Sequence, residues 1–402
     1  MTRPFRRRVL YIPGYDPIPP RRYRELYRRE GAEQARISGY RLGFGPRRDR
    51  TGFGWGVEGD FDGRRCEAEI EVLVWADIVQ GSMGQSIAAT YGQLVRTAWA
   101  YIGTGALMRL MRLRRGPVIA ALYPVVVLIG QALAALAVGG LVGWGLGRLT
   151  GLGWWLGAPV LLALTWAGLH LWRRQDGRIF AYYLMHDYAF TARDLGAYPP
   201  ALETRLAAFA DRLAEVVASG EWDEVLVVGH SSGAYLGVSV LARLLRSGRG
   251  PAPQGGTRLA FLSLGHVVPM ASFLPRATGL RADLRDLSAS PAITWIDVTA
   301  PGDGCCFGLC DPVAVSGVEP PGRLHPLVLS AAFSHTLSPE RLRALRGHWF
   351  RLHFQYLCAF DRPADYDYFA ITAGPLPLAE RFAGRSHSPG RIARPVNRWI
   401  AT

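Results

Sequence analysis

One serine in the chain stands in a setting that suits nucleophilic catalysis. Ser231 is the centre of a Gly-x-Ser-x-Gly pattern, after a β-branched run at residues 224–228 and before a helical stretch at residues 234–245. A serine on a sharp turn between a strand and a helix is held exposed, and the flanking glycines let the two elements pass closely. We predict that Ser231 attacks an acyl carbonyl, with Ser232 as the rival nucleophile at the same turn.

This strand, serine turn and helix resemble the nucleophile elbow of the α/β-hydrolase superfamily, especially its lipase-like and esterase-like members. The resemblance covers the polar, globular-looking sequence on both sides of an apolar insertion. It implies the α/β-hydrolase fold, a mostly parallel sheet flanked by helices. It also implies that a serine, an acid and a histidine follow one another in that order along the chain.

The implied order calls for an acid beyond Ser231, at the end of a later strand. Residues 259–265 and 292–298 read as strands, and the second runs into a turn-rich segment at residues 299–304. Asp303 in that segment is the candidate acid, Asp311 is the runner-up, and Asp297 lies within the strand itself. Each of these could instead cap a turn, which is the commoner role of an aspartate beside glycine or proline.

The same order implies a histidine near the end of the domain. His353 lies in an apolar and aromatic stretch at residues 350–357 and is the candidate base, with His335 and His348 as alternatives. Two further histidines, His325 and His387, also follow the candidate acids. A histidine among aromatic residues is also typical of a packed core, and that is the interpretation favoured for His230, which is expected to point away from Ser231.

Two backbone segments could bind the oxyanion of the reaction. The N–H of Ser232 lies at the start of the predicted helix, where it can stabilise negative charge. Residues 8–17 form a short apolar strand that breaks at a Pro-Gly pair, and the N–H of Gly14 or Tyr15 is the second candidate donor. Residues 72–77 are predicted to form a neighbouring strand.

Two apolar stretches interrupt the chain. No charged residue lies between Arg115 and Arg148, and a second uncharged stretch covers residues 149–172. Because about 20 helical residues cross a bilayer core, both stretches are long enough to span it. We predict residues 1–115 as the first part of the α/β domain, residues 116–172 as a transmembrane helical hairpin, and residues 173–402 as the second part of the domain.

The arginines around the hairpin predict its orientation. They gather before the first span and after the second, whereas the predicted turn at residues 147–151 carries only Arg148. The positive-inside rule therefore places the α/β domain on the cytoplasmic side of the inner membrane. The segment at residues 91–113 mixes arginines with apolar side chains, and either lies along the headgroups or packs on the domain.

The overall charge favours anionic partners. The chain has 46 basic and 32 acidic residues, a net charge of +14, and every basic residue is arginine. An anionic lipid surface fits this balance, but no nucleic-acid-binding signature accompanies it, and codon bias can produce the same excess of arginine.

Three of the five cysteines lie within residues 305–310 at a spacing that fits no common zinc site. We expect no metal, no nucleotide cofactor and a reducing compartment.

The sequence therefore predicts a membrane-anchored serine hydrolase that cleaves an acyl ester, of a lipid or another amphiphile, through an acyl-enzyme on Ser231 with Asp303 and His353. An acyltransferase that uses the same serine is an alternative, since only the acceptor differs. A non-catalytic membrane scaffold that keeps the fold is the other alternative. The oligomeric state stays open.

Overall fold

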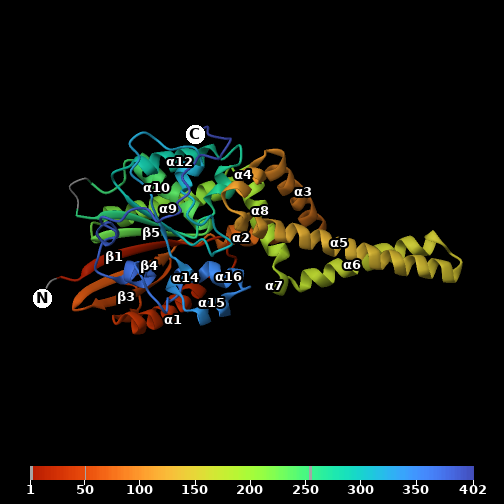
Figure 1. Ribbon diagram of the computed structural model, residues 1–402, viewed down its shortest axis with the longest axis horizontal. Helices are drawn as coiled ribbons and strands as arrows, with labels where there is room; N and C mark the ends of the chain where they lie inside the picture. The colour runs from red at the N-terminus through yellow and green to blue at the C-terminus, as the bar shows by residue number, and fades with distance from the viewer. Residues whose placement is uncertain (1–2, 50, 253–255) are drawn as a thin grey trace.

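Eight strands form one sheet, in the order β2-β3-β4-β1-β5-β6-β7-β8. The computed structural model describes residues 3–49, 51–252 and 256–402 (Figure 1). Neighbouring strands from β4 through β1 to β8 are parallel, and β2 and β3 extend the sheet antiparallel. The strands are β1 (Phe5–Ile12), β2 (Arg41–Gly45), β3 (Phe53–Phe61), β4 (Arg64–Val72), β5 (Glu224–His230), β6 (Arg258–Leu264), β7 (Thr294–Thr299) and β8 (Leu327–Ser330).

Helices cover both faces of the sheet, so the protein has an α/β architecture with a mostly parallel sheet. Figure 1 shows α9, α10 and α12 on one face and α1, α15 and α16 on the other. The helices are α1 (Arg21–Ser38), α2 (Ala76–Met83), α3 (Ile87–Gly103), α4 (Ala106–Leu113), α5 (Arg115–Thr150), α6 (Trp154–Arg174), α7 (Asp176–Ile179), α8 (Ala181–Ala192), α9 (Pro200–Ala218), α10 (Ser232–Arg246), α11 (Val268–Ser272), α12 (Thr278–Ala289), α13 (Pro312–Val315), α14 (Phe333–Thr336), α15 (Pro339–Leu345), α16 (Trp349–His353), α17 (Tyr368–Ala373) and α18 (Leu378–Arg381), with a 3-10 helix at Phe354–Leu357.

The central strands are apolar on both sides because helices bury both. Val225 and Val227 of β5 pack with the helices α9 and α10, whereas Leu226 and Val228 face the opposite layer. Successive side chains of a strand point to opposite faces, so a continuous apolar run is what a sheet covered on both faces requires.

The two halves of the sheet come from opposite sides of the apolar insertion. β1, from the first part of the chain, pairs in parallel with β5, from the second, with Arg7 opposite Glu224 and Ile12 opposite Gly229. The sheet is therefore completed only by pairing across the insertion, and this pairing brings the end of β1 beside the end of β5.

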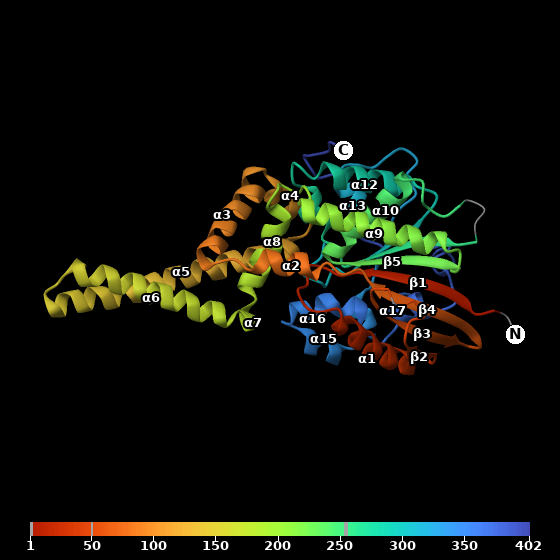
Figure 2. The same ribbon diagram turned by 180° about the vertical axis from the view of Figure 1, so that it is seen from behind.

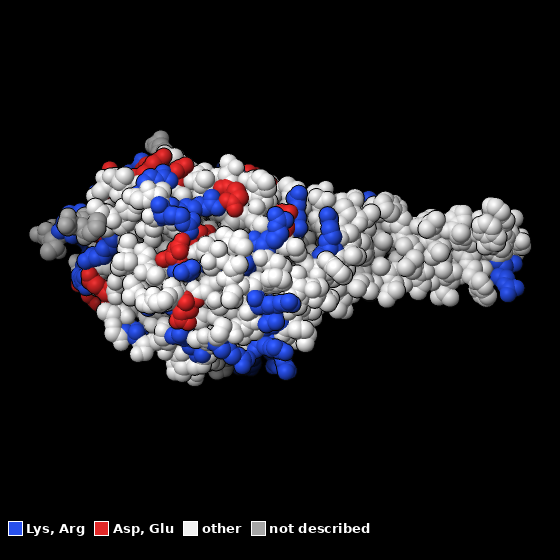
Figure 3. Space-filling view, turned by 90° about the horizontal axis from the view of Figure 1, so that it is seen from above, with Lys and Arg blue, Asp and Glu red and all other residues white. Residues whose placement is uncertain are grey.

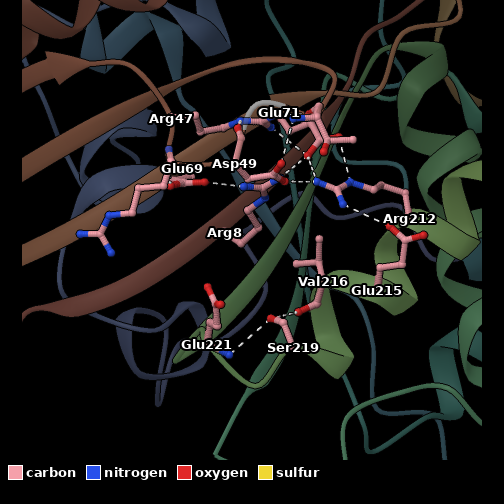
Figure 4. Close-up of polar contacts among 12 residues, drawn as sticks. Arg8, Arg47, Asp49, Glu69, Glu71, Arg212, Glu215, Val216, Ser219 and Glu221 are labelled. Carbon is pink, nitrogen blue, oxygen red and sulfur yellow. Dashed lines mark hydrogen bonds and ion pairs between the residues drawn. The ribbon is translucent and has the colours of Figure 1, made fainter.

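Arginines in β1 are buried in ion pairs. Arg8 pairs with Glu69 at 2.6 Å and also contacts Glu71 of β4, which accepts further hydrogen bonds from Arg47 and Arg212 (Figure 4). Arg7, on the opposite face, donates to Glu224 at 2.7 Å. The arginine run at the start of the chain thus belongs largely to the interior of the sheet, not to a surface available for lipid.

The insertion forms an antiparallel helical hairpin that projects from the domain (Figures 1 and 2). Both α5, with 36 residues, and α6, with 21, are long and apolar enough to cross a membrane. At 1.5 Å per residue α6 is about 30 Å long, which matches the hydrocarbon core of a bilayer. The first part of α5 packs on the domain, where Val118 and Leu128 are buried.

Glycines let the two helices of the hairpin approach closely. A Cβ atom at Gly143 would lie 2.4 Å from the carbonyl oxygen of Gly157, and one at Gly147 would lie 2.3 Å from that of Gly153. Small residues four apart on one face are the usual means by which membrane helices pack. These glycines therefore stabilise the contact between α5 and α6.

Two local predictions are wrong. A strand is predicted at residues 72–77, but β4 already ends at Val72. The chain leaves the sheet there: the Trp75 indole donates to the Pro13 carbonyl at 3.0 Å, and α2 begins at Ala76. The turn of the hairpin lies at residues 151–153, beyond the predicted position. α5 continues past Arg148 and ends at Thr150, and the next residue, Gly151, has a φ of 71°, the left-handed conformation that commonly closes a helix.

Candidate active site

Ser231 occupies the turn between β5 and α10 in a strained backbone conformation. Its φ of 58° and ψ of −121° are values that a residue with a side chain rarely adopts. A Cβ at Gly229 would lie 2.5 Å from the Gly233 carbonyl oxygen, and one at Gly233 would lie 2.1 Å from that of Ile12. Glycine is therefore required at both positions, and the surroundings hold the turn in this conformation.

Two neighbouring segments flank the serine. The Ser231 N–H donates to the carbonyl of Leu264, at the end of β6, at 2.9 Å. On the other side, the loop after β1 comes so close that a Cβ at Gly14 would lie 3.0 Å from Ser231 Cβ and 3.5 Å from its Oγ. The hydroxyl thus sits at the carboxyl ends of β1, β5 and β6, where parallel sheets commonly bind ligands.

Among the backbone N–H groups around this serine, those of Gly14, Tyr15 and Ser232 have no hydrogen-bond acceptor within the described chain. Ser232 is the first residue of α10, so its N–H has no partner inside the helix. Buried N–H groups are normally paired, and unpaired ones beside a nucleophile suit the binding of an oxyanion.

Asp303 and His353 are brought together from segments fifty residues apart. His353, the last residue of α16, donates from Nδ1 to Asp303 Oδ2 at 2.7 Å, and both side chains are buried. The edge of the imidazole lies at Gly265, since a Cβ there would be 3.2 Å from His353 Cε1. Gly265 directly follows Leu264, whose carbonyl holds Ser231, so the pair lies beside the serine turn.

The Asp303 carboxylate is stabilised in its charged form. Burial alone would raise its pKa, but the His353 imidazole and the Cys305 N–H, which donates at 2.9 Å, lower the pKa below its usual range. An ionised carboxylate fixes the Nδ1–H tautomer of His353 and leaves Nε2 free to accept a proton. Within the described residues no hydrogen bond joins Nε2 to Ser231 Oγ, a contact that free enzymes often lack until substrate binds.

Tyr356 is a member of the site that the sequence did not reveal. Its hydroxyl donates to Asp303 Oδ2 at 3.1 Å and accepts from the Ala300 N–H at 2.9 Å. It lies three residues after His353, so one short segment supplies both side chains that hold the carboxylate. The only available signal was this three-residue spacing, which one helical turn brings to the same side.

Asp187 of α8 is a second residue that the sequence did not reveal. It is half-buried, and its carboxylate has no hydrogen-bond donor among the described residues. Burial raises the pKa of Asp187 to about 7, against the opposing charge of His353. It lies close enough to Tyr15 and Tyr235 to raise their pKa values as well. Asp187 could not be recognised from the sequence, because a single aspartate among aromatic residues matches no motif.

The alternative acids serve other parts of the fold. Asp297, inside β7, accepts from Ser263 Oγ at 2.6 Å and lies 3.6 Å from His266 Nε2. Asp311 caps α13, accepting from two N–H groups of that helix, and pairs with Arg323.

The alternative histidines lie away from the Asp303 carboxylate. His335 and His348 are exposed, and His387 Nδ1 accepts from the Val328 N–H at 3.1 Å. His325 is half-buried, and burial lowers its pKa. His230 donates from Nε2 to the His353 carbonyl at 3.0 Å, and burial lowers its pKa to about 3, so it packs as a neutral ring behind α16.

Asp303, Cys305 and His353 also present three potential metal ligands, with atoms within 4.8 Å of one another. A metal would compete with the Asp303–His353 hydrogen bond for the same groups. Burial raises the pKa of the Cys305 thiol, which disfavours the thiolate that a metal binds. The donor set fits a hydrogen-bonded acid–imidazole pair better than a metal centre.

Two hollows border the loop that carries Asp303. One, of about 550 Å³, is lined by Gly302 and His335 among others, and the second, of about 750 Å³, reaches Gly304 and Trp349. Ser231 lines neither of them. They offer apolar space close to the acid, on the side of the loop that meets α15 and α16.

Comparison with protein-family models, with curated proteins and with solved structures finds no match to this chain. The residues of the site must therefore carry any assignment of function.

Proposed function

We propose that this protein is a membrane-anchored serine hydrolase with an α/β-hydrolase fold, which cleaves an acyl ester through an acyl-enzyme on Ser231. The observation that carries the proposal is the 2.7 Å hydrogen bond between His353 and Asp303 beside a strained serine turn. A serine after a central parallel strand, followed by an acid and a histidine in chain order, supports this fold.

In the proposed reaction His353 Nε2 accepts the Ser231 proton while Oγ forms a bond to the carbonyl carbon of the ester. The N–H groups of Ser232 and of Gly14 or Tyr15 stabilise the negative charge that develops on the carbonyl oxygen. The proton then passes to the alkoxide that leaves, which yields an alcohol and an acylated Ser231. Water repeats the two steps with the same histidine and releases the carboxylic acid.

The hairpin supports a membrane location for this chemistry. A Cβ at Gly116, near the start of α5, would lie 3.2 Å from the backbone of Gly304, the residue after Asp303. The side chain of Arg114 also donates to the Gly308 carbonyl at 2.7 Å. The anchor thus begins against the acid loop, and an ester of a lipid or another amphiphile is the substrate class that fits. The arginines at the domain end of the hairpin support a cytoplasmic location of the domain, by the positive-inside rule.

Fluorophosphonate labelling of the full-length protein in membranes tests the proposal. The wild type should be labelled, Ser231→Ala should not, and Ser232→Ala should keep its label because only its backbone N–H takes part. Asp303→Asn and His353→Ala should lose most of the labelling rate. A folded, inserted wild type that takes no label would instead favour the non-catalytic scaffold.

Product analysis separates hydrolysis from acyl transfer by the same serine. Free carboxylic acid released from an ester in bilayers indicates a hydrolase, whereas an acyl group recovered on a second alcohol or amine indicates a transferase. Efficient cleavage of short soluble esters with no action on lipids would remove the lipid substrate from the proposal.

A further inference from the structure

Helix α3 has two apolar faces, but the domain covers only one. Ile87, Leu94 and Tyr101 lie on the buried face. The opposite face carries Val95, Trp99 and Ile102, whose exposed fractions are 65%, 76% and 62%. A helix that is apolar all round is normally buried on all sides. The outer face of α3 therefore lacks a partner within the described chain.

The outer face of α3 is continuous with the base of the hairpin. The Tyr91 hydroxyl donates to the Leu128 carbonyl of α5 at 2.8 Å, and Arg173, at the end of α6, donates to the Gln85 carbonyl at 2.7 Å. Figures 1 and 2 show α3 at the end of the domain from which the hairpin projects. A bilayer that surrounds the hairpin would reach this end of the domain first.

The charge at this end of the domain is almost entirely positive. In residues 84–180 the only acidic residue is Asp176, and its carboxylate is occupied by the N–H groups of Tyr182 and Tyr183. In the same range, apart from Arg148 at the far end of α5, the exposed arginines without a salt bridge to any described residue are Arg96, Arg112, Arg115, Arg173, Arg174 and Arg178. Seen from above, the projecting hairpin shows a basic patch at its tip, where the only basic residue in the sequence is Arg148, and no acidic side chain (Figure 3).

We propose that the outer face of α3, with Met108 of α4, is a second membrane-contact surface that lies in the headgroup region of an anionic bilayer. Val95, Trp99, Ile102 and Met108 enter the acyl boundary, and the surrounding arginines bind the anionic headgroups. A second copy of the chain fits this face less well, because association would bring two sets of unpaired arginines together.

This contact would fix the tilt of the domain on the membrane. A single hairpin leaves the domain free to swing about its base, whereas a second contact through α3 does not. Helix α8, which carries Asp187 and whose Tyr183 donates to the Tyr15 carbonyl, packs between this surface and the serine turn. The proposal rests on the membrane anchoring in the proposed function and is independent of the esterase chemistry.

Lipid-borne quenchers test the surface in the full-length protein in nanodiscs of phosphatidylcholine mixed equally with phosphatidylglycerol. An environment-sensitive fluorophore is attached to Trp99→Cys, to Leu141→Cys in the hairpin, or to Leu324→Cys, an exposed control on the domain. Labelled wild type gives the background from the five native cysteines. Nitroxide lipids should quench positions 99 and 141 severalfold more than position 324, and aqueous iodide should show the reverse order.

The outcomes separate the surface from the rest of the proposed function. Iodide quenching at position 99 equal to that at 324, with position 141 still quenched by lipid, would overturn the surface alone. Loss of lipid quenching at position 141 would overturn the anchoring itself. Shielding of position 99 from both quenchers that grows with protein concentration would indicate a second copy and overturn the proposal.

Charge and catalysis are tested in the same assay. Arg96→Glu combined with Arg112→Glu should reduce lipid quenching at position 99, and so should nanodiscs of phosphatidylcholine alone, while position 141 stays unchanged. Unchanged quenching in both cases would overturn the role of anionic lipid. Ser231→Ala should quench as the wild type does, because the contact does not depend on the reaction.

Discussion

At the scale of single residues, the Asp303 carboxylate receives two donors on the same oxygen, Nδ1 of His353 and the hydroxyl of Tyr356. The histidine bond orients the ring, whereas the tyrosine bond restrains the carboxylate itself. Removing one donor from a charged acceptor weakens its restraint but leaves the other contact in place. Tyr356 is therefore a positioning residue in the proposed mechanism, distinct from the groups that transfer protons.

Tyr356→Phe should lower the rate of fluorophosphonate labelling by about tenfold, the loss expected for one hydrogen bond to a charged group. Asp303→Asn should lower it by about 10⁴-fold, because the imidazole then loses its tautomer control. Tyr366→Phe is the matched control, because its hydroxyl bonds the Tyr356 carbonyl at 2.6 Å and does not touch Asp303.

Asp297 gives a prediction on stability and pH. Burial raises its pKa to about 6 in the folded protein, against about 3.9 in an unfolded chain. The folded state therefore binds the proton more tightly than the unfolded chain does. As the pH rises from about 4 to about 6, the free energy of unfolding falls, and above that range the full cost of burying the charged carboxylate is present. Asp297→Asn removes this cost of the buried charge and should stabilise the protein at pH 8 by about 3 kcal/mol, with little effect at pH 4.

The midpoint of thermal unfolding in nanodiscs, compared at pH 4 and pH 8, measures this difference. Asp62→Asn, at an exposed position, is the control and should shift neither midpoint. If Asp297→Asn lowered the midpoint at pH 8 by as much as at pH 4, the native site would hold the carboxylate in its charged form. That result would contradict the prediction.

At the scale of elements, the hairpin depends on the close approach of α5 and α6. Gly143→Ala places a Cβ against the Gly157 carbonyl and should lower the stability of the hairpin by about 1–3 kcal/mol. Gly140→Ala is the matched control, since its Cβ would meet nothing within 4 Å. Thermal unfolding in nanodiscs should show a lower midpoint for Gly143→Ala only, and equal midpoints would indicate that the helices separate without cost.

The elements near Ser231 could be predicted because local patterns define them. The helical stretch predicted at residues 234–245 lies within α10 (Ser232–Arg246), and the run at 224–228 lies within β5 (Glu224–His230). The steric requirements of the serine turn involve only five consecutive residues, so a local sequence pattern is enough to recognise the turn. The site residues Asp303 and His353 followed only from the chain order of a resembling superfamily.

The remaining elements depend on contacts between distant segments. Val72-Leu73-Val74-Trp75 has the composition of a strand, but the Trp75 indole bonds the Pro13 carbonyl and turns the chain away. Asp187 and Tyr356 join the site only because α8 and the 3-10 helix at Phe354–Leu357 pack beside it, and neither residue has a motif of its own. No local pattern could have placed them there.

At the scale of the whole molecule, the net charge of +14 is not a measure of the surface charge. Arg7, Arg8 and Arg281 are fully buried and bonded within the fold. The exposed arginines at the base of the hairpin are a separate group. The positive charge of the chain is thus divided between arginines buried in the fold and exposed arginines, which include those of the proposed membrane contact.

The buried ion network predicts an unequal cost of two glutamate substitutions. Glu71→Gln removes the charge that Arg8, Arg47 and Arg212 share, and should destabilise the protein by about 3–5 kcal/mol because buried cations lose their partner. Glu67→Gln breaks only the exposed pair with Arg48 and should cost about 1 kcal/mol or less. Chemical denaturation of both variants measures the difference, and similar midpoints would contradict the role of Glu71.

The pairing of β1 with β5 across the hairpin has a consequence for biosynthesis. The ribosome delivers β1 to β4 and then the hairpin before any residue of β5 exists, so one edge of β1 stays open until β5 is made. An open edge of an apolar strand invites pairing with other nascent chains. In the proposed membrane topology the hairpin would confine this half-built sheet to the membrane surface, and the missing strand would arrive from the same polypeptide about a few seconds later. The proposed anchor would thus tether the chain during assembly before it holds the finished domain.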